Sequence, residues 1–219
     1  MGPIKYLRIR IKAPLQSWGL DSCSYKFRST SSMPTFSGVL GMLCASLGIS
    51  FRKQPNAVKE LRDALQMDVH VVTQGSRLID FQGAGGGENS GTPYGKMCIP
   101  KDDAGSTGKI YEKEYLQGAY FEVVLRLTDS SVSDKLVHSL QNPKWQMFAG
   151  RKGCLLSLPP FGGAFDTPEE VKNAWVQEGV KPVMHYIQNP LGESIKDYPV
   201  CLGDNQTVFR KVVKESSWP

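Results

Sequence analysis

The segment PKWQMFAGRKGC, residues 143–154, places two aromatic rings and two cations within eight positions. Trp145 and Phe148 offer flat apolar faces, and Arg151 and Lys152 follow directly after a glycine. Aromatic rings stack on unpaired bases, and Lys and Arg neutralise phosphates, so this combination suits single-stranded nucleic acid. The same residue types also occur where aromatic rings are buried at the edge of the core and neighbouring charges are exposed to solvent. The segment therefore favours a nucleic-acid hypothesis that needs support from the remaining residues.

Residues that commonly catalyse reactions are sparse in this sequence. His70 and His185 lie in strand-like patterns and His138 in a helix-like pattern, and none has a nucleophile at a recognisable spacing. The glycine-rich segment GTPYGKM, residues 91–97, is one residue short of a Walker A loop and has Met97 where a hydroxyl should bind magnesium. We therefore expect neither an NTPase nor a bound metal or cofactor.

One catalytic alternative stays open, namely cleavage of RNA without a metal. This reaction needs a general base, a general acid and cations that stabilise the phosphorane, and Tyr and Lys can fill these roles. Tyr25, Lys26, Tyr111 and Lys113 supply such groups.

The length and composition indicate a globular chain with a sizeable core. Its 219 residues include five cysteines without a CxxC pair, which favours reduced thiols and a cytoplasmic protein. The uncharged run 34–51 contains glycines and serines, so it predicts a buried helix, and we expect no membrane contact.

The charge is distributed unevenly along the chain. Up to Lys53 there are eight Lys and Arg against the single Asp21, so this quarter carries +7 and the remaining residues −2, for the total of +5. A concentration of positive charge indicates contact with a polyanion, although such a segment is often only a solvated face.

The periodicity predicts a sequence of strands and helices. Residues 4–12 alternate apolar side chains with Lys5, Arg8, Arg10 and Lys12, which predicts a half-buried strand with a basic outer face. Helices are predicted at 34–49, 56–65, 133–143 and 167–179, and strands at 68–74, 119–129, 154–158 and, in shorter form, 183–187, 198–202 and 207–213. The order is β-α-β, insertion, β-α-β, which is the α+β ferredoxin-like arrangement of RNA-recognition modules.

Two further features need a structural explanation. The first helix carries a stripe of small residues, Gly38, Gly41, Ala45 and Gly48, so a sheet, a helix or a partner should pack closely there. Residues 83–109 contain eight glycines, and we expect this insertion to be mobile in the free chain and ordered by partners.

Four sequence blocks carry a resemblance to a known family. In order along residues 4–163 they are LRIRIKAPLQSWG, PTFSGVLGMLCASLGI, YEKEYLQGAYFEVVL and FAGRKGCLLSLPPFGG. Together they resemble the CasD-type CRISPR-associated protein 5 family of the RAMP superfamily. The resemblance implies an RRM-like RAMP domain over residues 1–160, a β-hairpin thumb inserted at about 76–116, and a small C-terminal extension over 161–219.

The resemblance also implies a function and a set of contacts. The function is that of a non-catalytic RNA-binding subunit that caps the 5′ handle of the crRNA in an antiviral type I-E Cascade complex. The implied handle contacts are Gln16, Trp18, Arg28, Ser37, Lys113, Trp145, Phe148, Arg151 and Lys152, and in the insertion we expect contacts from Tyr94 and Lys96. Ser37 is near a helix N-terminus, which favours a phosphate, while Trp18 is suited equally to the core.

The implied partners are the crRNA 5′ handle, the Cascade backbone subunit and the large PAM-reading subunit, with target DNA reached only through the complex. Two alternatives remain: a metal-independent endoribonuclease that processes CRISPR repeats, and a general single-strand binder. The Tyr-Lys-His set of related type I-C subunits that cleave RNA has no clear counterpart here, so we expect no enzymatic activity.

Overall fold

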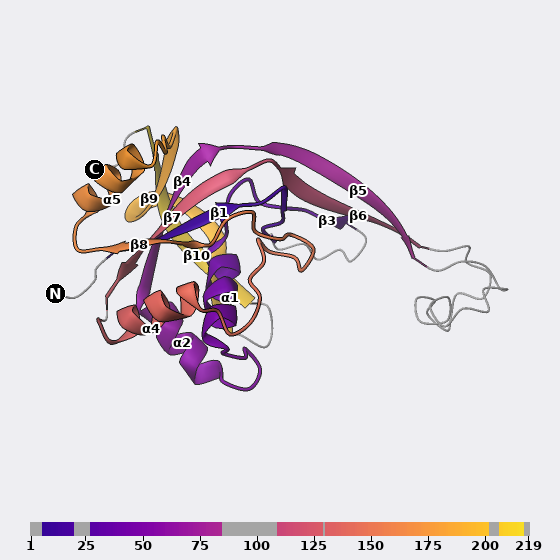
Figure 1. The fold of residues 1–219 in the computed structure, drawn as a ribbon. Helices are drawn as coiled ribbons and strands as arrows, with labels where there is room; N and C mark the ends of the chain where they lie inside the picture. Colours follow the sequence, from indigo (N-terminus) through magenta and orange to yellow (C-terminus); the bar gives the residue numbers. More distant parts are fainter. Residues whose placement is uncertain (1–5, 20–26, 85–108, 129, 202–205, 217–219) are drawn as a thin grey trace.

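The computed structural model describes residues 6–19, 27–84, 109–128, 130–201 and 206–216. The predicted contacts Tyr94 and Lys96, and the candidate catalytic residues Tyr25 and Lys26, lie outside the described residues. Figure 1 shows a large sheet with helices on its faces and a long hairpin, β5–β6, that projects away from it.

The helices and strands, in chain order, are β1 (Tyr6–Lys12), β2 (Leu15–Gln16), β3 (Phe27–Arg28), α1 (Phe36–Leu47), α2 (Pro55–Asp63), β4 (Leu65–Thr73), β5 (Ser76–Ala84), β6 (Lys109–Gln117), β7 (Tyr120–Leu127), α4 (Ser130–Gln141), β8 (Phe161–Phe165), α5 (Pro168–Gln177), β9 (Met184–Cys201) and β10 (Gln206–Glu215). The predicted helices are confirmed within a few residues. The short strands predicted near the C-terminus form two long strands, β9 and β10, whose pairing contains register shifts.

The main sheet has the strand order β10-β9-β4-β7-β1-β8, and all of its pairs are antiparallel. The predicted strand at 154–158 is wrong, because the strand that pairs with β1 is β8, Phe161–Phe165. Residues ahead of β8 run beside β1 with isolated bonds, such as Ser157 N–H to the Lys12 carbonyl at 2.8 Å. Pro159 and Pro160 lack backbone N–H groups, so a regular ladder cannot form there.

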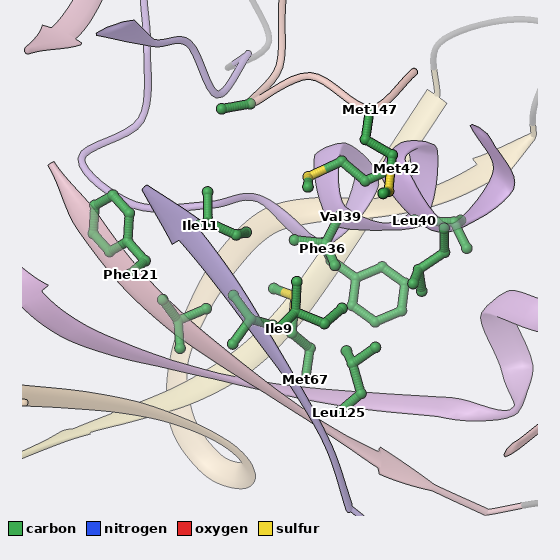
Figure 2. Packing of buried hydrophobic residues seen from close by; sticks show 14 of the residues in the cluster. Ile9, Ile11, Phe36, Val39, Leu40, Met42, Met67, Phe121, Leu125 and Met147 are labelled. Atoms are coloured by element: carbon green, nitrogen blue, oxygen red, sulfur yellow. The ribbon is translucent and has the colours of Figure 1, made fainter. Parts of the chain in front are cut away.

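One face of the sheet packs against α1 and α4 and forms the main core. Ile9 and Ile11 of β1 lie against Phe36 and Leu40 of α1, and Met67 of β4 belongs to the same buried cluster (Figure 2). The alternation of β1 therefore places its apolar residues as predicted.

Helix α5 packs on the opposite face of the sheet, where the basic residues of β1 lie as predicted but differ in exposure: Lys12 is exposed, Arg10 is half-buried and Arg8 is buried. Arg8 has no exposed surface, and its guanidinium pairs with Glu122 at 2.7 Å and with Glu178 at 2.8 Å. Arg10 donates to the Phe161 carbonyl at 2.8 Å. The hydrogen bond from Arg8 lowers the pKa of Glu178. Arg8 is therefore neutralised inside the protein and cannot contact a polyanion, whereas Arg10, 3.9 Å from Glu178, remains 26% exposed.

The hairpin belongs to a second, smaller sheet. Strands β5 and β6 pair antiparallel from Ser76 opposite Gln117 to Ala84 opposite Lys109, and β6 also pairs with β2 and β3. Strands β5 and β6 therefore flank the glycine-rich stretch, most of which lies outside the described residues.

The small stripe on α1 accommodates two large side chains. A Cβ on Gly38 would lie 2.8 Å from the ring of Trp18, and a Cβ on Gly48 would lie 2.1 Å from Lys144. Gly48 also has a φ of 71° as the C-cap of α1, a conformation that glycine adopts without strain. The close neighbours of Gly38 and Gly48 are thus side chains from loops, whereas a sheet, a helix or a partner was predicted, and nothing lies within 4 Å of a Cβ placed on Gly41.

No helix among the described residues is long and apolar enough to cross a membrane.

Candidate nucleic-acid interface

The base of the β5–β6 hairpin brings together basic residues that are distant in sequence. Strand β3 pairs in parallel with β6, and this register places Arg28 beside Lys113. Arg28 is exposed and Lys113 is half-buried. Two short strands thus place two of the predicted phosphate contacts side by side.

Lys113 is oriented by residues of the neighbouring strand β5. Its Nζ donates to Oε1 of Gln82, and Nε2 of Gln82 donates to Asp80 at 2.5 Å. Asp80 is also the residue directly opposite Lys113 in the antiparallel register. The ammonium group is therefore held at the hairpin surface by a polar chain rather than by a direct ion pair.

Arg151 connects the loop that follows α4 to strands β3 and β6 at the base of the hairpin. Its guanidinium donates to the Glu114 carbonyl at 3.0 Å and to the Arg28 carbonyl at 3.1 Å, and lies 4.8 Å from the centre of the Tyr115 ring. Arg151 was predicted to hold a phosphate directly. The geometry gives it a positioning role as well, because two of its N–H groups already bridge β3 and β6.

A glycine makes the approach of this loop possible. Gly150 has a φ of 93°, and a Cβ at this position would lie 1.7 Å from the carbonyl oxygen of Ser17. Ser17 N–H also donates to the Ala149 carbonyl at 3.0 Å. The glycine ahead of Arg151 and Lys152 therefore sets the position of both cations, and Lys152 is exposed.

Glu114 is a component of the site that was not predicted from the sequence. Its carboxylate accepts from the Thr30 N–H at 3.1 Å and pairs with Arg77 at 2.7 Å. The alternation in YEKEY, residues 111–115, was the available signal, since it places Glu114 and Lys113 on opposite sides of β6.

Two of the predicted RNA contacts are buried, which corrects their role. Gln16 and Trp18 have no exposed surface. Trp18 Nε1 donates to Oε1 of Gln16 at 3.0 Å, and Nε2 of Gln16 donates to the Ala119 carbonyl at 2.7 Å. Trp18 also packs on Gly38 of α1. A ring without exposed surface cannot stack on a base, so these residues support the interface from beneath.

The aromatic residues of the same loop have different exposures. Trp145 is 46% exposed, and its backbone N–H donates to the Ala45 carbonyl at 3.1 Å, near the C-terminal end of α1. Phe148 is half-buried and forms an isolated bridge with Leu155. Trp145 is therefore the better placed of the two rings to stack on a base.

Ser37 lies in the first turn of α1, where an anion already occupies part of the helix end. The Asp197 carboxylate accepts from the Phe36 N–H at 3.0 Å, and Thr35 Oγ1 accepts from the Gly38 N–H at 3.3 Å. Asp197 is in turn paired with Arg210 at 2.8 Å. Ser37 and Ala45 are eight residues apart, about 12 Å along the helix, so Ser37 and Trp145 lie near opposite ends of α1.

Of the groups considered for metal-independent cleavage, Tyr111 and Lys113 both lie on β6, two residues apart and therefore on the same side of the strand. His70 and His185 are buried together, with their Nδ1 atoms 2.7 Å apart, and His138 is exposed on α4. Burial raises the pKa of Cys44 to about 12 and also raises that of Cys154, so neither thiol is activated. No cluster of His, Cys, Asp and Glu that could hold a metal occurs in the described part of the chain.

The fold is that of solved CRISPR proteins. A structure titled "CRISPR RNA-guided surveillance complex" has a TM-score of 0.74 at 21% identity and covers 96% of this chain and 89% of that one. A structure titled "Crystal structure of Cas protein" has a TM-score of 0.68 at 25% identity and covers 96% and 93%.

The family follows from the sequence itself. The family described as "CRISPR-associated protein (Cas_Cas5)" matches residues 6–214, so the chain belongs to the CRISPR-associated protein 5 family. It is 27% identical over 200 residues to the CRISPR system Cascade subunit CasD of Escherichia coli (strain K12), covering 87% of this chain and 85% of the relative. The resemblance predicted from four sequence blocks is confirmed.

Proposed function

We propose that this chain is the subunit of a CRISPR RNA-guided surveillance complex that binds the 5′ handle of the guide RNA. The observation that carries the proposal is the surface at the hairpin base, where Arg28, Lys113 and Arg151 from three distant segments meet. Together with the exposed Trp145 and Lys152, this surface offers cations for phosphates and one ring for an unpaired base. Family membership and the similarity to a Cascade subunit support it.

The architecture is proposed to be a ferredoxin-like RAMP core with a thumb. Within the main sheet, the unit β8-β1-β7-β4 with helices α1 and α4 has the order expected of that arrangement. The β5–β6 hairpin is the proposed thumb. The division at residue 160 stays a prediction, and the pairing of β8 with β1 favours a boundary after Phe165.

The proposed partners are the backbone subunit beside the thumb and the large PAM-reading subunit, with target DNA contacted through the complex. Tyr94 and Lys96 of the insertion are proposed to contact RNA and the backbone subunit. Exposed apolar residues on the hairpin, Ile79 at 47% and Phe81 at 67%, support a protein contact along β5.

The chain is proposed to bind RNA without cleaving it. The buried His70–His185 pair cannot serve as a base at the hairpin surface, and Lys113 is engaged by Gln82. An endoribonuclease would need a base and an acid beside the scissile phosphate.

One experiment tests both parts of the proposal. The purified chain is incubated in EDTA with labelled repeat RNA, handle RNA and a scrambled RNA of equal length. We expect intact RNA and tighter binding of the handle than of the scrambled sequence. Site-specific cleavage abolished by Lys113→Ala would establish the endoribonuclease instead, and equal affinity for both RNAs would indicate a general single-strand binder.

A further inference from the structure

A pocket of about 620 Å³ opens between the ends of β4 and β7 and the β9–β10 hairpin. Its lining includes Gln66 and Arg126, which are cross-strand neighbours, and Phe209 and Lys211 of β10. None of the predicted RNA contacts lines it, although the lining residue Arg210 pairs with Asp197 at the N-terminus of α1, next to Ser37. Gln66 is near the start of β4 and Arg126 is near the end of β7, so the pocket lies at the ends of these strands that do not lead into the β5–β6 hairpin.

The pocket has a positive lining without a carboxylate. Arg126 donates to Asp68 at 3.0 Å and to the Gln188 carbonyl at 2.9 Å, while its Nε has no hydrogen-bond partner among the described residues. Lys211 is exposed at the same wall. The nearby carboxylates of Asp68 and Asp197 are buried, and each already pairs with an arginine. The two lining arginines, Arg126 and Arg210, are thus each balanced by a buried aspartate, and the exposed Lys211 supplies the uncompensated positive charge to which an anion can bind.

The same lining offers an aromatic face and amide groups. Phe209 is 64% exposed, although an isolated phenylalanine is normally buried. Gln66 is exposed and Asn189 half-exposed, and their side-chain amides carry both donors and acceptors. A ring, two cations and two amides match the π-face, the phosphate and the polar edge of one nucleotide.

We propose that this pocket binds one unpaired nucleotide of a single-stranded nucleic acid, with the base on Phe209 and the phosphate between Arg126 and Lys211. The site goes beyond the proposed handle interface, since it shares no residue with it. A protein partner fits less well, because interface cores are depleted of lysine and this wall is predominantly polar.

Photochemical cross-linking of the full chain tests the proposal. Pentanucleotides with a central 5-iodouracil are prepared as RNA and as DNA, and the adducts are mapped by mass spectrometry after trypsin digestion. Stacking on Phe209 predicts an adduct in the peptide of residues 197–210. The RNA and DNA arms show which strand the pocket accepts, and an adduct in either supports the proposal.

Matched variants assign the adduct to the pocket. Phe209→Leu should abolish it, and Lys211→Gln should raise the oligonucleotide concentration for half-maximal cross-linking about tenfold, the effect of one lost charge-assisted hydrogen bond. Lys214→Gln removes an exposed cation from the same strand outside the pocket and should leave that concentration unchanged.

The double variant Arg28→Gln/Lys113→Gln separates the two sites. It should retain the adduct at residues 197–210 even though it impairs handle binding, so failure of either proposal is recognised independently. No adduct at 197–210 with RNA or DNA, or equal behaviour of the Lys211 and Lys214 variants, overturns the pocket proposal. So does a Phe209→Leu protein that cross-links normally but loses a protein subunit on assembly, because the surface then docks a protein.

Discussion

The basic residues of β1 and those at the base of the β5–β6 hairpin carry similar charge in different surroundings. Arg8 has no exposed surface and is bonded to Glu122 and Glu178 beneath α5. Arg28 is exposed, and Lys113 beside it is held by the neutral amide of Gln82. Charge that is compensated inside the protein cannot release counterions from a nucleic acid, whereas exposed charge can.

The difference lies in what later parts of the chain supply to each region. Glu178 follows α5, 170 residues after Arg8, and closes the outer face of β1. At the hairpin base the distant segment is the loop containing Arg151, which adds a cation instead of a carboxylate. The local excess of positive charge in the first quarter therefore predicts a nucleic-acid surface only where no acidic segment returns to it.

The largest expected effect is on the buried side of this comparison. Glu122→Gln breaks the fully buried ion pair of Arg8 and leaves only the part-exposed Glu178 as its partner, so it should lower the free energy of unfolding by about 3 kcal/mol, measured by urea denaturation. Glu178→Gln removes a partner that is 41% exposed and should cost at most about 1 kcal/mol. If Glu122→Gln is as stable as wild type and instead weakens RNA binding, the β1 face is part of the RNA surface.

Two tryptophans give a second comparison between an exposed and a buried residue. Trp145→Ala removes an exposed ring and should weaken handle RNA binding by about 1–3 kcal/mol with little change in stability. Trp18→Ala empties a buried site and should lower the free energy of unfolding by about 3–5 kcal/mol. Fluorescence anisotropy and denaturation of both variants measure the two effects. A Trp145→Ala protein that binds normally would remove the ring from the interface.

The covered face should also respond to pH, unlike the hairpin base. Burial lowers the pKa of His70 well below its usual value, and the charge of His185 lowers it further. Burial also lowers the pKa of His185, with Glu215 opposing the shift and Lys172 adding to it. Below an unfolded-state pKa of about 6.5, the unfolded chain then binds more protons than the folded chain.

Stability should therefore be full above about pH 6.5 and decrease as the pH falls, with a limiting slope of about 1.4 kcal/mol per pH unit for each unprotonated histidine. Urea denaturation at pH 7.5, 6.5 and 5.5 measures it. Glu122, cross-strand to His70, is present in both proteins, so the double variant His70→Gln/His185→Gln should have a flatter profile. Identical profiles would exclude the histidine pair as the cause.

The sequence predicts helices and strands well where the hydrophobic periodicity is strong. It predicts contacts poorly where they depend on segments that are distant in the chain. The alternation of β1 and the uncharged run 34–51 are local patterns, and each produced the expected element, a strand and the helix α1. The strand expected at 154–158 does not form; Pro159 and Pro160 follow that run directly, and the strand that pairs with β1 begins after them, at Phe161.

The candidate site was predictable in composition but not in the roles of its members. Arg28 and Lys113 came together as neighbours on β3 and β6, although nothing in the sequence sets that parallel register. The burial of Gln16 and Trp18 depends on the close approach of Gly38 and on the Ala119 carbonyl, which are distant in the chain. Glu114 was not predicted because its role depends on contacts with Thr30 and Arg77, which are distant from it in the sequence.

The most direct test compares two double variants that each lose two positive charges, one pair at the hairpin base and one pair elsewhere in the basic first quarter of the chain. Arg28→Gln/Lys113→Gln removes two cations at the hairpin base, and Arg52→Gln/Lys53→Gln removes two exposed cations between α1 and α2. The affinity of each protein for handle RNA is measured across a salt series. The slope of log affinity against log salt is negative, and we predict that the first variant makes it less steep by about 1.4 while the second leaves it unchanged. Equal slopes for wild type and the Arg28/Lys113 variant would contradict the placement of the guide RNA at the hairpin base.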